Sequence, residues 1–121
     1  MDNKEFSKQL EERTKKFAIE IIKLSSLLPE TPEGKVIKYQ ITKSGSSVGA
    51  NYREANRSRS KADFKNKIKI SESEASETVY WLEIIERMNW IDNKKSQTML
   101  TEANELLAIF TSIGSKLNKS T

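Results

Sequence analysis

The chain has 121 residues and a net charge of +4, with 36% hydrophobic and 31% charged residues. This length fits one domain, and this composition suits amphipathic helices better than a thick α/β core. Cysteine and histidine are both absent, which excludes disulfides, thiolate nucleophiles, Ser-His pairs and conventional zinc sites. Because the sequence has neither a long apolar run nor a signal-peptide pattern, we expect a cytoplasmic protein that does not contact a membrane.

The positive charge is concentrated in the middle of the chain. Between Lys35 and Lys69, ten basic residues accompany two acidic ones, a local balance of +8, while the remainder carries −4. Segregated charge of this kind creates a field that attracts anions. We therefore expect an anionic partner, with an ordinary solvated lysine-rich face as the alternative.

Apolar residues recur at helical spacing in four segments. Pro29 ends the first segment, and Thr31 followed by Pro32 has the form of an N-cap with proline at N1. The sequence predicts a single domain, residues 1–121, with helices over residues 3–28, 32–56, 61–89 and 93–117.

Short connections favour an antiparallel arrangement of these helices. Ser60 and Asp63 resemble a capping box, and Asp92 is a good N-cap for the last helix. We expect the polar tail after Leu117 to fray. The predicted fold is an all-α, up-down-up-down four-helix bundle.

The stretch from residue 41 to residue 55 keeps helical spacing but puts polar residues where a core is expected. Ser44 and Asn51 fall on the buried seam, with Ser47 and Glu54 beside it. Buried polar groups cost free energy unless they are paired, so we predict that Ser44, Asn51 and Glu54 hydrogen-bond to the third helix and fix its register. The candidate partners there are Ser71, Glu74, Glu77 and Thr78.

Small residues in the same stretch indicate close approach by a neighbouring helix. Each interior glycine costs about 1 kcal/mol of helix propensity relative to alanine. We expect Gly45, Gly49 and Ala50 to offset this cost by admitting a neighbouring backbone. The alternative is a flexible loop at this position.

The third helix is apolar on more than one side, because Trp81, Ile84 and Met88 form a second stripe. Such a helix is central in its bundle or lies in a subunit contact. Trp81, Ile84, Met88 and Trp90 are therefore candidate contact residues, with burial in the protein's own core as the alternative.

Three runs of the sequence resemble a known family: Lys43 to Glu54, Ser60 to Phe64, and Ser71 to Leu82. They look like the signature of the four-helix-bundle proteins associated with 23S ribosomal RNA intervening sequences, a family related to the accessory variability determinant of diversity-generating retroelements. Lys43 stands where that family often has arginine. The signature positions are Ser44, Ser47, Asn51, Glu54, Glu74, Glu77 and Trp81.

The resemblance implies a bundle that assembles into a homopentameric ring. In the retroelement branch it also implies a basic protein that binds nucleic acid and a reverse transcriptase. We therefore favour sequence-independent phosphate binding to DNA or RNA, since no recognition-helix motif or aromatic stacking platform is evident. The candidate contact residues are Lys43, Arg53, Arg57, Arg59, Lys61, Lys65 and Lys69.

Two other classes of function are alternatives to nucleic-acid binding. A structural scaffold without nucleic-acid binding is the main one. Catalysis would need Glu54, Glu74 and Glu77, the only clustered carboxylates, but helical di-metal sites generally add histidine and this chain has none. We expect no enzymatic activity, no metal and no cofactor.

Overall fold

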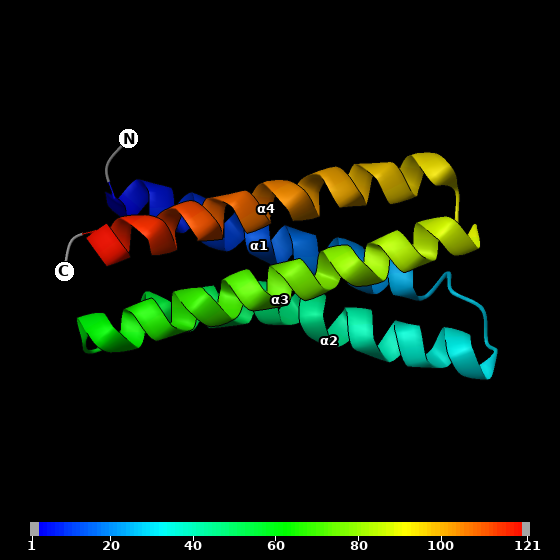
Figure 1. The fold of residues 1–121 in the computed structure, drawn as a ribbon, viewed down its shortest axis with the longest axis horizontal. Coiled ribbons are helices and arrows are strands. Elements are labelled where there is room, and N and C mark those ends of the chain that lie inside the picture. The colour runs from blue at the N-terminus through cyan, green and yellow to red at the C-terminus, as the bar shows by residue number, and fades with distance from the viewer. Residues whose placement is uncertain (1–2, 120–121) are drawn as a thin grey trace.

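The computed structural model describes residues 3–119 as four long helices packed side by side (Figure 1). No strand occurs within this range. Consecutive helices run in opposite directions in the ribbon, so the predicted all-α, up-down-up-down arrangement is confirmed. The helices are α1 (Asn3–Ser25), α2 (Pro32–Ala55), α3 (Lys61–Met88) and α4 (Asn93–Lys119).

The first connection begins earlier than predicted, because α1 ends at Ser25 and not at Leu28. The backbone N–H groups of Leu27 and Leu28 donate to carbonyls three residues back, at 3.0 and 3.2 Å. Pro29 disfavours helical geometry in the residue before it, which explains this tightened turn. Leu28 still reaches the core. Thr31 then caps α2, its Oγ1 accepting a hydrogen bond from the Gly34 N–H at 3.1 Å.

The remaining helix ends follow their predicted capping residues. Ser60 Oγ accepts from the Asp63 N–H at 3.0 Å, and Asn89 ends α3 in the left-handed region with φ 55°. The predicted fraying after Leu117 is wrong for the described residues, since α4 continues to Lys119. The cations of its last turn suit the negative end of the helix dipole. Residues 120 and 121 lie outside the described range.

The core is formed by the inward stripes of all four helices. The ring of Tyr52 from α2 meets the ring of Phe110 from α4 edge to face, with centroids 5.5 Å apart. The regular apolar spacing predicted for α4 is confirmed by its buried residues Met99, Ala103, Leu106 and Phe110. Other large buried side chains are Phe17, Ile21, Leu24, Ile41, Ile68, Leu82 and Ile85.

The seam between α1 and α4 is the least extensive of the four helix contacts. It is held by Arg13, whose Nε and Nη2 donate to the two carboxylate oxygens of Glu102 at 2.8 and 2.7 Å. Nη2 also donates to Glu105 at 2.8 Å. These contacts, led by the hydrogen bond to Glu102, raise the pKa of Arg13, so it stays charged. We call this group the Arg13 clamp.

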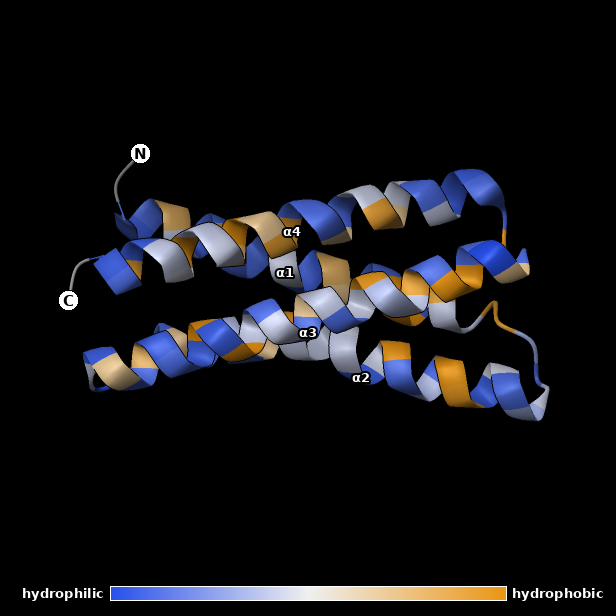
Figure 2. Cartoon of the chain, viewed as in Figure 1, coloured by the Kyte–Doolittle hydropathy of each residue, from blue (hydrophilic) through white to orange (hydrophobic). Residues whose placement is uncertain are grey.

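The two ends of the bundle differ in surface character. The connection between α2 and α3 lies at the same end as the start of α1 and the end of α4 (Figure 1). The opposite half exposes large apolar side chains, and Figure 2 shows apolar residues concentrated in that half of α2 and α3. We call this surface the apolar end, formed by Ile19, Ile22, Leu27, Val36, Tyr39 and Met88.

Candidate nucleic-acid interface

The connection between α2 and α3 is a tight, hydrogen-bonded turn. The backbone N–H groups of Arg57 and Ser58 donate to the carbonyls of Glu54 and Ala55, both at 3.1 Å. The Ser58 hydroxyl donates to the Ala55 carbonyl at 2.7 Å. Residues 56–60 therefore hold their side chains on an ordered support.

The turn is also tied to the first helix. The side-chain amide of Asn56 donates to Glu11 Oε2 of α1 at 2.8 Å. This contact links the end of α2 to a second element and restrains the turn from the side. The arginines that flank Asn56 in sequence thus project from a fixed base.

Five cations gather around this turn, and we call them the basic corner: Arg53, Arg57, Arg59, Lys61 and Lys65. All are exposed except Lys65, which is half-buried. Within residues 3–119, none of the five has a carboxylate oxygen within 4.0 Å. A cluster of cations without ion-pair partners on an ordered turn is suited to binding phosphate groups.

The other two predicted contact residues lie away from the basic corner. Lys43 is exposed near the middle of α2, about 20 Å from Asn56 at 1.5 Å per residue. Its charge acts on Glu74 of α3. Lys69 is exposed on α3, two turns beyond Lys61, where it lines a shallow groove. The seven predicted cations therefore form one cluster and two separate positions.

The signature residues bring α2 and α3 together through buried hydroxyl groups. Oγ1 of Thr78 lies 2.9 Å from Oγ of Ser44 and 2.8 Å from the Glu74 carbonyl. The Ser71 hydroxyl donates to the Val48 carbonyl across the same seam at 2.9 Å. The prediction that Ser44 pairs with α3 is confirmed. We call Ser44, Ser71 and Thr78 the hydroxyl seam.

Two signature carboxylates flank the hydroxyl seam on its solvent side. Burial raises the pKa of Glu74, and the nearby charge of Glu77 raises it further. The neighbouring Ser47 hydroxyl and the charge of Lys43 act in the opposite direction. Glu77 itself accepts a hydrogen bond from Trp81 Nε1 at 3.1 Å. The two carboxylates therefore each interact with a polar side chain on this surface.

The predicted hydrogen bonds from Asn51 and Glu54 to α3 are wrong. The Asn51 amide donates to the Ser47 carbonyl of its own helix at 2.9 Å, because its half-buried position leaves the backbone as the nearest acceptor. Glu54 is exposed and makes no side-chain hydrogen bond within residues 3–119, since it projects from the outer face of α2. Register is therefore set by hydroxyl groups and not by the amide or this carboxylate.

Gly45 and Gly49 of α2 contact α1. A Cβ at Gly45 would lie 2.8 Å from Ile21 Cγ2, and one at Gly49 would lie 2.8 Å from Thr14 Oγ1. The prediction of close approach is confirmed at both positions, while Ala50 is exposed. The flexible-loop alternative is wrong, because α2 is continuous through this segment.

The second apolar stripe of α3, formed by Trp81, Ile84 and Met88, is partly buried in the protein's own core and partly exposed. Trp81 is partly buried and packs against the core, as does Trp90 beyond the helix end. Met88 is 50% exposed, and Ile84 is half-buried. Part of the stripe thus belongs to the bundle's own core, while its outer members remain open to a partner.

Neither a metal site nor a membrane span is found in the part of the chain that the structure describes. No cluster of three or more acidic side chains is arranged to hold a metal ion there. None of the four helices, over the same residues, is both long and apolar enough to cross a membrane.

The fold and its signature define a class, the antiparallel four-helix bundle with a hydroxyl-paired α2–α3 seam. The family model described as 23S rRNA-intervening sequence protein matches residues 7–112. The chain therefore belongs to this family, and the resemblance inferred from the sequence is confirmed. The relation to retroelement accessory proteins stays a prediction.

A solved structure supports the same assignment. The chain is similar to a protein of unknown function from the S23 ribosomal protein family of Bacteroides thetaiotaomicron, with 36% sequence identity and a TM-score of 0.79. The similarity covers 86% of this chain and 96% of that one. No curated protein matches the chain.

Proposed function

We propose that this protein is a non-catalytic, oligomeric nucleic-acid-binding protein of the cytoplasm that contacts phosphate groups through the basic corner. The observation that carries this proposal is a set of five cations on a rigid turn, with no carboxylate partner among residues 3–119. Phosphate contacts of this kind position a protein on DNA or RNA without reading sequence. Their free energy comes largely from counterion release and falls with salt.

The apolar end supports self-association. Tyr39 and Val36 are 64% and 56% exposed, and neighbouring helices add further apolar side chains to the same half of the bundle. Exposed apolar surface of this kind marks contact sites. A homopentameric ring formed through this half would repeat the basic corner around its axis and multiply weak phosphate contacts. A reverse transcriptase or another RNA or DNA enzyme is the partner that such a ring would assist.

A scaffold that binds protein alone is the second candidate function. It is favoured by the same exposed apolar residues, which suit a partner protein as well as another copy. In that case the basic corner would be an ordinary solvated surface. Binding measurements separate the two functions because the scaffold requires no affinity for nucleic acid.

The test is fluorescence anisotropy of labelled duplex DNA, single-stranded DNA and structured RNA across a salt series. The variant Arg57→Glu, Arg59→Glu, Lys61→Glu should bind far more weakly than the wild type. The salt slope should fall by about 0.9 for each duplex phosphate that the variant no longer neutralises. Light scattering on the same samples should give a mass that is a multiple of the 13.9 kDa chain.

A matched control separates the basic corner from net charge. Lys23→Glu, Lys94→Glu, Lys95→Glu changes the charge by the same amount at exposed positions in the opposite half of the bundle. This control should retain most of the affinity, and light scattering should give it the same mass as the wild type, which shows that the added charges leave self-association intact. Equal loss in both variants would show a general charge effect, and unchanged binding in the corner variant would reject the basic corner as the contact surface.

A further inference from the structure

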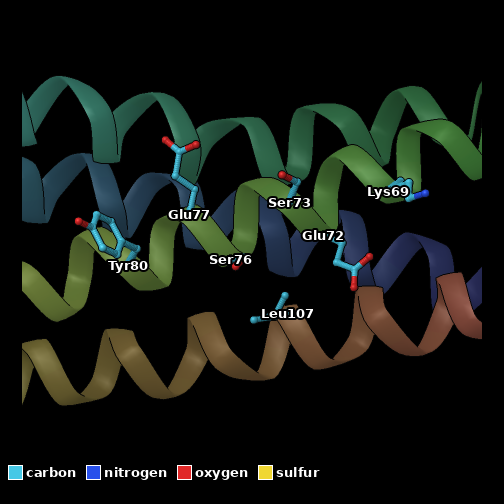
Figure 3. Close-up of a pocket in the computed structure, with 7 residues that line it drawn as sticks. All are labelled: Lys69, Glu72, Ser73, Ser76, Glu77, Tyr80 and Leu107. Atoms are coloured by element: carbon cyan, nitrogen blue, oxygen red, sulfur yellow. The ribbon is translucent and has the colours of Figure 1, made fainter.

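The outer face of α3 carries a shallow groove of about 710 Å³, and its end at Lys69 lies two helical turns from Lys61 of the basic corner. Figure 3 shows its side chains along α3, with Leu107 of α4 forming one wall. Lys61, Lys65 and Lys69 are spaced four residues apart, so they lead from the corner to one end of the groove. The residues that line it are Lys69, Glu72, Ser73, Ser76, Glu77, Tyr80 and Leu107.

Both acidic side chains of the groove are held at its edges. Glu72 accepts a hydrogen bond from Thr111 Oγ1 of α4 at 2.7 Å, and Glu77 accepts one from Trp81 Nε1 at 3.1 Å. In Figure 3, Glu72 is directed toward α4 and Glu77 toward α2. Between these two carboxylates, the floor of the groove therefore presents the uncharged hydroxyl groups of Ser73 and Ser76.

The far end of this strip is an exposed aromatic ring. Tyr80 is 56% exposed and contacts the ring of Trp81 edge to face, with centroids 5.0 Å apart. The hydrogen bond between Trp81 and Glu77 fixes the indole against which the tyrosine rests. Tyr80 is thus an open aromatic surface on a supported side chain, which is a suitable platform for base stacking.

We propose that this groove binds single-stranded nucleic acid, with a base stacked on Tyr80 and the adjoining phosphates at Lys69 and the basic corner. This inference rests on the proposed function, and it narrows the ligand from nucleic acid in general to single-stranded nucleic acid. Tyr80 lies about 16 Å from Lys69 along the helix, a distance that several nucleotides of an extended strand can cover. A cationic track combined with stacking aromatics is the usual means of binding single strands.

Duplex nucleic acid does not fit the groove in the same way. Its bases are stacked and paired, so their faces are not available to Tyr80, and only phosphate contacts at the corner remain. The hydroxyl groups of Ser73 and Ser76 can hydrogen-bond base edges. Carboxylate oxygens at the groove edges can accept from exocyclic amino groups. The groove should therefore prefer single-stranded to duplex nucleic acid, whereas the basic corner should bind both.

The test compares Tyr80→Ala with the wild type on unstructured single-stranded DNA, unstructured RNA and duplex DNA at one low salt concentration. Loss of one stacked base should weaken single-strand binding roughly 5- to 150-fold. Duplex affinity should not change. Tyr80→Phe should retain single-strand affinity, because the ring and not the hydroxyl group makes the stack.

Phe6→Ala is the matched control, since Phe6 is 40% exposed on α1 and lies outside both the groove and the apolar end. Circular dichroism should show all three variants fully helical. Unchanged single-strand affinity in Tyr80→Ala, with binding abolished by the corner substitutions, would overturn the groove and leave the proposed function standing. No binding of any nucleic acid by the wild type would overturn both.

Discussion

The two sides of α2 are packed by opposite means. Toward α1, the helix has no side chain at Gly45 and Gly49, and atoms of Ile21 and Thr14 occupy the space. Toward α3, it offers Ser44 and the Val48 carbonyl to buried hydroxyl groups. One side depends on shape alone, whereas the other depends on hydrogen bonds.

This difference shows how one helix can specify two neighbours. Glycine contacts set the distance between α1 and α2, because any added atom forces the backbones apart. Hydroxyl pairs set the register between α2 and α3, because a shift along the axis would leave buried polar groups unpaired. The two sides should therefore respond differently to substitution.

The largest expected effect is on the glycine side. Gly49→Leu places a Cβ 2.8 Å from Thr14 Oγ1 and 3.2 Å from the backbone carbon of Thr14. Overpacking costs about 1–3 kcal/mol, and the Thr14 backbone atom in the way puts this site at the upper end of that range. After the roughly 1 kcal/mol gained in helix propensity, the net loss should be about 2 kcal/mol. Urea unfolding should show a clear loss in the free energy of unfolding.

The same substitution at Gly114 of α4 is the control for propensity. A Cβ there would meet no atom within 4 Å. Gly114→Leu should therefore raise the free energy of unfolding by up to about 1 kcal/mol. Stabilisation by leucine at both glycines would contradict the steric account of the α1–α2 seam.

A smaller effect is expected on the hydroxyl side. Thr78→Val keeps the shape of the side chain but removes the hydroxyl that contacts Ser44 and the Glu74 carbonyl. The loss should be about 1 kcal/mol, because Ser44 loses its short contact at 2.9 Å and keeps only the long one to the Ile41 carbonyl at 3.4 Å. Thermal or urea unfolding would measure it.

A double-mutant cycle with Ser44→Ala sharpens this result. Removing both hydroxyl groups leaves no unpaired partner, so the double variant should lose less than the sum of the two single losses. Coupling of about 0.5 kcal/mol or more would support direct pairing. Strictly additive losses would show that the two hydroxyl groups act independently.

The smallest effect concerns Glu74, beside the hydroxyl seam. Its pKa is raised in the folded protein, so folding favours its protonated form and ionisation opposes folding. Glu74→Gln should therefore stabilise the protein at pH 7, by roughly a few tenths of a kcal/mol given solvent screening. The gain should shrink toward zero as the pH falls below about 4. A gain that grows at low pH would reverse the assigned sign.

Much of the fold was predictable from local pattern. Apolar spacing indicated the four helices, and Thr31, Ser60 and Asp92 marked three of their starts. Low helix propensity around Gly45 and Gly49 correctly indicated close approach. The sequence also contained a signal that the approaching helix is α1. Thr14 stands there at a position where the helical spacing calls for an apolar residue, and Thr14 faces Gly49.

Other features depend on tertiary contacts that local pattern does not contain. The Arg13 clamp joins residues 89 and 92 positions apart. The Asn51 amide donates its hydrogen bond to the Ser47 carbonyl of its own helix. A heptad count cannot distinguish this bond from one across the seam to α3. The exposure of Tyr80 also depends on tertiary packing, because it is set by how α4 packs beside α3. In the sequence, only its position next to Trp81 could have suggested an aromatic platform.

The Arg13 clamp has a consequence for how the chain folds. Helices adjacent in sequence make the extensive contacts, so most of the structure can form through local hairpins with little loop-closure cost. The α1–α4 seam joins the two distant ends of the chain and is suited to closing last. Contacts formed after the transition state slow unfolding more than they speed folding. Salt or the loss of Arg13 should therefore shorten the lifetime of the folded state while leaving the folding rate nearly unchanged.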